Sequence, residues 1–264
     1  MGMIEVGGLR VAYKRAGDGP PLVLLHGYAG DGPATWRWQL EGLCGEFTVV
    51  AWDARGAGRS PPPPESFGMA GYADCLAGFA GGLGLVKPHV AGLSFGGAPA
   101  LAFCRRHPAI PGTLILASAY AGWACSLPAD VAEQRLRQAL VLMSLPPSEF
   151  AGELLPTTFS EATPRVNDGE FGASMLVFHP AGFRAIARVS AENLRDALPH
   201  INVPTLLVYR GHDARAPLTV AEGLYAAMSG SALVVLPEVG HLCHIEDPGQ
   251  FNSAARDFLR GWRS

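Results

Sequence analysis

The sequence predicts a doubly wound α/β fold, in which helices cover both faces of a mainly parallel sheet. Short, continuous apolar runs recur along the chain without the alternation of a strand that has one solvent-exposed face. Helical patterns lie between these runs, and parallel strands need crossover connections that usually are helices. Because 48% of the 264 residues are hydrophobic, the chain is long enough to bury one sizeable core.

The chain is expected to open with a β-hairpin. The β-rich stretches MIEV (3–6) and LRVAYKR (9–15) flank the pair Gly7-Gly8. Two such stretches around Gly-Gly are typical of a hairpin with a tight primed turn. The first two strands are therefore predicted to be antiparallel.

The later apolar runs are predicted to be strands with both faces covered, and the segments between them to be helices. The predicted strands are 21–27, 47–53, 89–94, 113–118, 205–211 and 232–238. The predicted helices are 36–43, 69–83, 98–107, 218–228 and 251–262.

The alternation of strands and helices stops between about 120 and 180, where helical patterns and prolines replace it. An insertion that leaves the carboxyl end of a central strand overhangs the place where open α/β sheets bind ligands. We therefore expect a core domain formed by residues 1–120 and 181–264, with residues 121–180 as a helical cap inserted after the sixth strand.

Composition excludes several classes of function. A formal net charge of −3 supplies no basic surface for nucleic acid. The five cysteines are odd in number and form no CxxC pair, which argues against a disulfide framework or a structural zinc site and favours a reducing compartment. The N-terminus MGMIEVGGLR has no secretory-signal pattern, and no apolar run is long enough to span a bilayer. We expect a cytoplasmic protein without membrane or nucleic-acid partners; its oligomeric state stays open.

One serine stands in an unusual glycine-rich turn. Ser94 lies between Gly92 and Gly96, where a predicted strand passes into a predicted helix. This is the G-x-S-x-G pattern of a sharp strand-to-helix turn, in which side chains two positions before and after the serine would collide with the chain. The turn is expected to strain Ser94 and to hold its hydroxyl at the positive end of the helix.

A serine hydroxyl becomes a useful nucleophile only when a base removes its proton and a third group orients that base. Asp213 follows the predicted strand TLLVYRG, and His241 follows the predicted strand ALVVLPE. The order serine, acid, histidine is the one expected for a sheet of this type.

At five places the chain resembles the α/β-hydrolase family. The matching motifs are HGYAG (26–30), DARGAGRS (53–60), GLSFGG (92–97), GHDARAP (211–217) and GHLCHIEDP (240–248). They resemble the family's oxyanion loop, the turn after its fourth strand, its nucleophile elbow, its acid turn and its histidine loop. Each one stands at the end of a predicted strand, and together they extend over most of the chain outside the cap.

The resemblance implies an acyl-enzyme on Ser94, with His241 as general base and then acid, and Asp213 orienting it. It also implies an oxyanion hole made by the backbone amides of Tyr28 and Phe95, whose side chains are candidates for substrate binding. No cofactor is implied.

Other residues near these motifs have simpler interpretations. Asp53 and Arg55 are expected to stabilise their turn, and Asp247 to cap the last helix. HLCH offers two histidines and a cysteine without a fourth ligand, so His244 and Cys243 are expected to pack rather than to bind a metal. Trp123, at the entrance to the cap, is a candidate for either substrate binding or anchoring.

The leading hypothesis is hydrolysis of a small carboxylic ester or lactone, because the motifs and size resemble small bacterial carboxylesterases and 3-oxoadipate enol-lactonase-like proteins. Serine at position 94 excludes relatives that open epoxides or displace halide with a carboxylate. Relatives with the same triad stay open as alternatives: C–C bond hydrolases, cofactor-free haloperoxidases or perhydrolases, and hydroxynitrile lyases. A ligand receptor with slow turnover is the alternative from another class.

Overall fold

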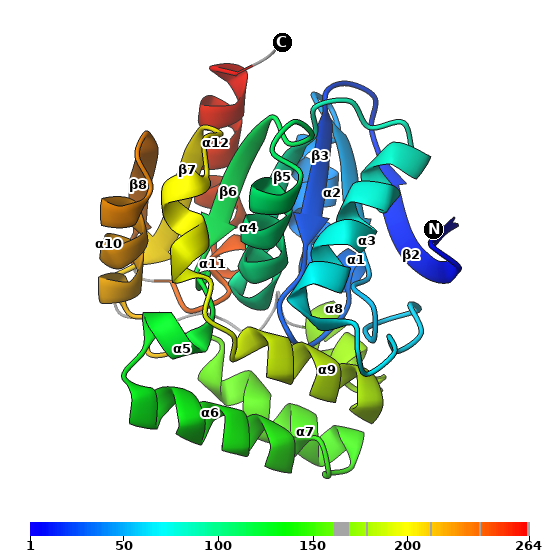
Figure 1. The fold of residues 1–264 in the computed structure, drawn as a ribbon, viewed down its shortest axis with the longest axis vertical. Helices are drawn as coiled ribbons and strands as arrows, with labels where there is room; N and C mark the ends of the chain where they lie inside the picture. Colours follow the sequence, from blue (N-terminus) through cyan, green and yellow to red (C-terminus); the bar gives the residue numbers. More distant parts are fainter. Residues whose placement is uncertain (161–168, 178, 212, 238, 263–264) are drawn as a thin grey trace.

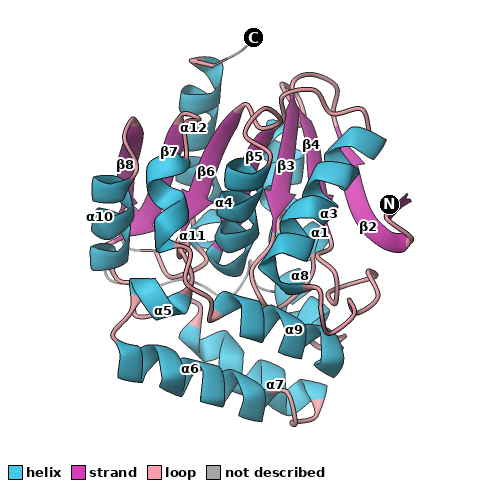
Figure 2. Ribbon diagram, viewed as in Figure 1, coloured by secondary structure: helices cyan, strands magenta, loops and turns pink. Residues whose placement is uncertain are grey.

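The computed structural model describes residues 1–160, 169–177, 179–211, 213–237 and 239–262. Its centre is an eight-stranded sheet with the strand order β1-β2-β4-β3-β5-β6-β7-β8. Helices pack on both faces of this sheet, and a separate layer of helices lies beyond the carboxyl ends of the strands (Figure 1, Figure 2). This is the predicted doubly wound α/β fold.

The strands are β1 Gly2–Val6, β2 Leu9–Ala16, β3 Pro21–Leu25, β4 Thr48–Trp52, β5 His89–Leu93, β6 Thr113–Ala117, β7 Thr205–Arg210 and β8 Ser231–Leu236. β1 and β2 form the predicted hairpin, with Gly7 and Gly8 in the left-handed region at φ +55° and +76°. β2 is antiparallel to β4, and the pairs from β4 through β8 are parallel.

The central strands are covered on both faces, as the apolar runs predict: all residues of β4, β5 and β6 are buried. The same prediction is wrong for β8, whose residues are mostly half-buried or exposed, with Val235 42% exposed. β8 pairs only with β7 at the edge of the sheet, so its neighbours cover it incompletely.

The helices of the core are α1 Gly32–Thr35, α2 Arg37–Leu43, α3 Gly68–Gly82, α4 Gly97–Arg106, α10 Leu218–Ala227, α11 Cys243–Glu246 and α12 Pro248–Arg260. Five of them follow the predicted segments closely, whereas the four-residue helices α1 and α11 were not predicted. α3, α4 and α10 cover one face of the sheet, and α2 and α12 the other (Figure 1). As predicted, Asp247 caps α12: its Oδ1 accepts a hydrogen bond from the Gln250 amide at 2.9 Å.

Between β6 and β7 the described chain is helical. These helices, named here the insertion, are α5 Trp123–Ser126, α6 Ala129–Leu142, α7 Pro147–Leu154, α8 Gly169–Met175 and α9 Pro180–Ser190, with short 3₁₀ turns at Leu155–Thr157 and Arg195–His200. Residues 161–168 and 178 of the expected cap lie outside the described residues. α9 lies beyond the predicted boundary at 180 but belongs to the same layer (Figure 1). No described helix combines the length and apolarity needed to cross a membrane.

Candidate active site

The sheet and α4 fix the position of Ser94. β5 ends at Leu93, a 3₁₀ turn follows at Ser94–Gly96, and α4 begins at Gly97. Ser94 has φ +49°, in the left-handed region that costs an L-residue free energy, and it is buried. The predicted strained turn is present.

Steric crowding explains the glycines around Ser94. A β-carbon on Gly92 would overlap the carbonyl oxygen of Gly96, and one on Gly96 would overlap the carbonyl oxygen of Leu25. A β-carbon on Gly97 would overlap the side chain of Ala119. Only glycine lets the turn approach the neighbouring strands this closely.

Asp213 and His241 meet although 28 residues separate them. The Asp213 Oδ2 and His241 Nδ1 atoms are 2.7 Å apart, and both residues are buried. Asp213 Oδ1 accepts hydrogen bonds from the amides of Arg215 and Ala216, at 2.8 and 2.9 Å. These two amides fix the carboxylate, and the carboxylate fixes the imidazole with Nδ1 as donor and Nε2 free to accept.

The environment of Asp213 favours its charged form. Burial alone would raise the pKa of Asp213, but the neighbouring His241 and the hydrogen bonds from the Ala216 and Arg215 amides outweigh this effect and lower the pKa from 3.8 to about 2. The pair is therefore an ion pair whenever His241 is protonated.

Ser94 and His241 line the same small cavity, of about 20 Å³. Its other lining residues are Gly27, Tyr28, Ala29, Leu93, Leu154, Thr158, Phe171, Arg215 and Leu242. The elbow, the histidine loop and the insertion all contribute to this list. The structure thus brings the three predicted triad residues together at the carboxyl end of the sheet.

The loop after β3 lies against the elbow. A β-carbon on Gly27 would lie 3.9 Å from the Ser94 Cβ, so the backbone at Gly27-Tyr28 runs directly beside the serine. Phe95 is the second residue of the 3₁₀ turn, and the first amides of a helix have no acceptor within it. Both amides predicted for the oxyanion hole therefore belong to chain segments adjacent to Ser94.

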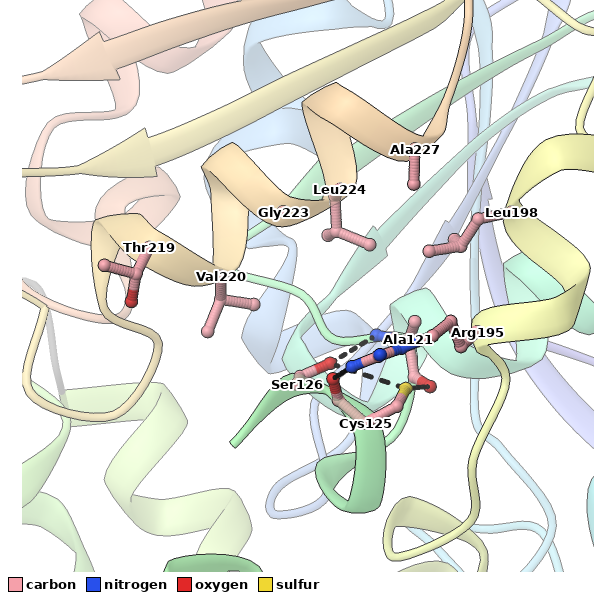
Figure 3. Close-up of a pocket in the computed structure, with 10 residues that line it drawn as sticks. All are labelled: Ala121, Cys125, Ser126, Arg195, Leu198, Thr219, Val220, Gly223, Leu224 and Ala227. Carbon is pink, nitrogen blue, oxygen red and sulfur yellow. Dashed lines mark hydrogen bonds between the residues drawn. The ribbon is translucent and has the colours of Figure 1, made fainter. Parts of the chain in front are cut away.

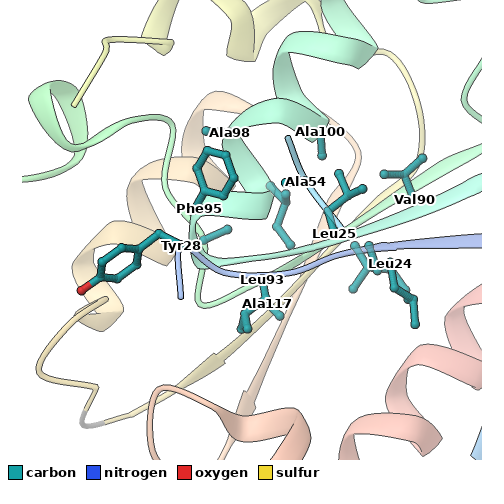
Figure 4. Close-up of a cluster of buried hydrophobic side chains, with 14 of the residues drawn as sticks. Leu24, Leu25, Tyr28, Ala54, Val90, Leu93, Phe95, Ala98, Ala100 and Ala117 are labelled. Atoms are coloured by element: carbon teal, nitrogen blue, oxygen red, sulfur yellow. The ribbon is translucent and has the colours of Figure 1, made fainter. Parts of the chain in front are cut away.

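The three aromatic side chains considered for substrate binding have different surroundings. Tyr28 lines the cavity, whereas the Phe95 ring packs edge-on against Tyr72, with 5.6 Å between centroids. Trp123 packs edge-on against Tyr28 at 6.2 Å and is 4% exposed. In the apolar cluster of Figure 4 the rings of Tyr28 and Phe95 point in different directions. Neither Phe95 nor Trp123 is among the residues that line the cavity at Ser94.

Buried polar groups hold the loops that carry the site. His26 Nε2 accepts a hydrogen bond from the Ala54 amide at 2.9 Å, and burial lowers the pKa of His26, so it is a neutral anchor. Asp53 accepts hydrogen bonds from the amides of Gly32 and Arg59, both at 2.9 Å. Asp53 therefore has the structural role that the sequence predicts.

His244 and Cys243 pack in the core, as expected. Cys243 is fully buried, and the His244 ring packs against Trp36 in a tilted arrangement, with 4.4 Å between centroids. His244 Nε2 lies 3.0 Å from the Thr35 carbonyl oxygen, to which it donates. Burial lowers the pKa of His244 to about 3, so its ring is neutral.

Among the larger cavities that do not include Ser94, two border the helices α5 to α7 of the insertion. One, of about 400 Å³, lies between α5 and α10 and includes Cys125 and Arg195 in its lining (Figure 3). The other, named here the outer cavity, measures about 550 Å³ and lies between α6, α7 and the acid turn. Tyr28, Leu154 and Arg215 line both the outer cavity and the small one at Ser94.

Sequence reasoning missed Arg215 as a residue of the site. Its side chain reaches back over the ring of Tyr28, with 5.5 Å from Cζ to the ring centroid. The only signal in the sequence is its place two residues after Asp213, and that spacing does not reveal the direction of the side chain.

Comparison with known proteins defines the class. The sequence profile of the alpha/beta hydrolase family matches residues 22–254, so the chain belongs to this family. The structure of a thermophilic esterase from Thermogutta terrifontis, solved with malate bound, is 32% identical, with a TM-score of 0.89 and 100% of each chain covered. The serine hydrolase BPHL of Homo sapiens is 26% identical over 267 residues, 97% of this chain and 85% of its own length.

An enol-lactonase from Burkholderia xenovorans LB400 has a TM-score of 0.86 over 98% of this chain and 100% of its own. At 23% identity this likeness concerns the fold alone. Family and relatives agree on the broader activity: the protein is a hydrolase.

Proposed function

We propose that the protein hydrolyses a small carboxylic ester or lactone through an acyl-enzyme on Ser94. The observation that carries this proposal is the buried 2.7 Å contact between His241 Nδ1 and Asp213 Oδ2, together with the cavity that His241 and Ser94 share. The likeness to the esterase of Thermogutta terrifontis supports an ester as the substrate.

In the proposed reaction, Ser94 Oγ attacks the carbonyl carbon while His241 Nε2 takes its proton. The amides of Tyr28 and Phe95 stabilise the negative charge that develops on the carbonyl oxygen, each contributing roughly a hundredfold in rate. His241 returns the proton to the leaving alkoxide, which stays tethered to the acyl group when the substrate is a lactone. A water molecule, deprotonated by His241, then releases the acid and restores Ser94.

The insertion is proposed to act as a cap over this reaction. Leu154 of α7 and Phe171 of α8 line the cavity at Ser94, so the insertion supplies apolar walls close to the nucleophile. Such walls exclude water and select the shape of the acyl group.

Labelling with a fluorophosphonate tests the nucleophile directly. The wild-type protein is expected to be labelled at one site, and Ser94→Ala to lose the label and the activity. Ser126→Ala is the matched control, because Ser126 lines the cavity between α5 and α10 and not the one at Ser94. Labelling of Ser94→Ala equal to that of wild type would reject the proposed role of Ser94.

A substrate panel tests the reaction. We expect turnover of p-nitrophenyl esters of short acyl chains or of simple lactones, measured by release of nitrophenol or acid. Turnover below one per minute on every ester and lactone, with tight binding of some small molecule, would instead favour a receptor. If the protein instead hydrolyses the C–C bond of diketones produced by ring cleavage faster than it hydrolyses esters, C–C bond hydrolysis would be favoured.

A further inference from the structure

Arg215 lies at the boundary between the cavity at Ser94 and the outer cavity. Its backbone amide is held by Asp213 Oδ1 at 2.8 Å, so its position is tied to the acid of the site. Its Nη2 donates to the Tyr28 hydroxyl and its Nη1 to the Thr157 hydroxyl, both at 2.7 Å. The guanidinium group is therefore fixed beside Tyr28, whose hydroxyl points away from the apolar cluster (Figure 4).

The charge of Arg215 has no carboxylate partner within 4.0 Å in the described part of the chain. Its two side-chain partners are neutral hydroxyls. Asp213 is the nearby acid, and its carboxylate already binds His241 and two backbone amides. Arginine has five N–H donors, so Arg215 keeps donors for a further acceptor, and a half-buried cation without a directly bound carboxylate favours an anionic one.

The surroundings of the outer cavity are also basic. Arg135 lines it and donates from Nη1 to the Arg215 carbonyl oxygen at 3.0 Å. Arg137 lines it as well but pairs with Glu133, and Glu153 is the acidic side chain among the lining residues. Arg135 and Arg215 therefore leave an excess of positive charge beside this cavity.

The small cavity at Ser94 leaves little room for a whole ester, and the neighbouring outer cavity, which shares Arg215 with it, is the larger space for the rest of a substrate. About 20 Å³ holds roughly one water molecule, which is too little for an acyl group and a leaving group together. The residues that line both this cavity and the 550 Å³ outer cavity are Tyr28, Leu154 and Arg215. A substrate with its carbonyl at Ser94 would thus carry one of its two ends beside the guanidinium.

We propose that Arg215 binds a carboxylate on the substrate, so that the protein prefers esters or lactones with a negatively charged group on one side of the scissile bond. This inference rests on the proposed function. Arg215 is then a specificity residue of the site, and Tyr28 and Thr157 hold it in place.

Two matched substrate pairs test the proposal. The first compares mono-p-nitrophenyl adipate with p-nitrophenyl hexanoate, and places the charge on the acyl side. The second compares para-carboxybenzyl hexanoate with benzyl hexanoate, and places it on the leaving group. Wild type is expected to prefer the charged member of one pair, and Arg215→Met to lower kcat/KM for that member by about ten- to a hundredfold, without a comparable loss on the neutral member.

Three variants separate charge from structure. Arg215→Lys is expected to keep part of the preference, and Tyr28→Phe to reduce it without abolishing it, because the guanidinium loses one of the two hydroxyls that hold it. Arg184→Met removes an exposed arginine of α9 that lines neither cavity, so the preference is expected to stay as in wild type. Equal use of charged and neutral members by wild type, or an equal effect of Arg184→Met and Arg215→Met, would overturn the proposal and leave the hydrolase function standing.

Binding gives a readout that needs no turnover. Adipate is expected to raise the Tm of wild type, and of Ser94→Ala, more than the neutral adipamide does, and Arg215→Met is expected to lose this difference. If wild type hydrolyses none of the four esters, the proposed function fails, and the adipate measurement alone decides the proposal for Arg215: no differential shift would reject it.

Discussion

At the scale of single residues, hydrogen bonds to Asp213 fix the orientation of its carboxylate toward His241. Oδ1 accepts two backbone amides of its own turn, and Oδ2 is thereby left to face His241 Nδ1. Replacing Oδ2 of Asp213 by an NH₂ group would therefore change the tautomer of the His241 imidazole, although the side chain at position 213 would keep its shape.

Asp213→Asn is expected to lower kcat by about ten-thousand-fold on any ester that the wild type hydrolyses. The asparagine Oδ1 can still accept from the Arg215 and Ala216 amides, so its NH₂ group would face His241 Nδ1. The histidine must then carry its proton on Nε2, where it cannot take the proton of Ser94. Steady-state kinetics measure the effect.

The control is Asp247→Asn, the same chemical change at the N-cap of α12. Asparagine caps a helix as well as aspartate does, so activity and stability are expected to stay near wild type. A loss of less than tenfold in Asp213→Asn would contradict the assigned role of the carboxylate.

At the scale of elements, the elbow depends on how closely β5, the turn at Ser94–Gly96 and the end of β3 approach each other. Gly96 packs against the carbonyl oxygen of Leu25, at the point where β3 passes into the loop at Gly27-Tyr28. Displacement of this contact would move the nucleophile and the Tyr28 amide together.

Gly96→Ala is therefore expected to reduce the free energy of unfolding by about 1 to 3 kcal/mol or more, because backbone must shift to admit the methyl group. Activity is expected to fall further than stability. The matched control is Gly81→Ala in α3, where a β-carbon meets nothing within 4 Å and alanine should stabilise by about 0.5 to 1 kcal/mol. Urea unfolding measures both changes; similar unfolding midpoints for the two variants would argue against the crowded elbow.

At the scale of the whole molecule, two buried carboxylates affect stability in opposite directions as pH changes. The pKa of Asp213 is lowered to about 2, so its contribution to stability is present above its unfolded pKa of 3.8 and is lost as pH falls through 2. Burial raises the pKa of Asp53 from 3.8 to about 6, although its amide partners oppose the shift. Asp53 therefore costs stability as pH rises from about 4 to about 6.

The free energy of unfolding, measured in urea at several pH values, should reveal both effects. The stability advantage of wild type over Asp213→Asn is expected to shrink by about 2 kcal/mol between pH 5 and pH 2. Wild type should lose stability relative to Asp53→Asn between about pH 4 and pH 6. A constant difference between wild type and Asp213→Asn over the acid range would contradict the lowered pKa of Asp213.

The sequence by itself determined the order of strands and helices, the elbow around Ser94 and the chain order of Ser94, Asp213 and His241. These features are local, because each of them is encoded by an apolar run, by glycines or by a short motif of a few residues. The sequence also predicted two covered faces for β8, because an apolar run does not reveal a position at the edge of the sheet.

Only the tertiary structure decided which side chains line the space around the serine. In the structure the Phe95 ring packs against Tyr72, and the Trp123 ring packs against Tyr28. Arg215 lines both the cavity at Ser94 and the outer cavity. These outcomes depend on contacts between segments far apart in the chain, such as the bond from Arg215 to Tyr28 across 187 positions. Motifs fix where a residue stands along the backbone, whereas packing against distant neighbours fixes where its side chain points.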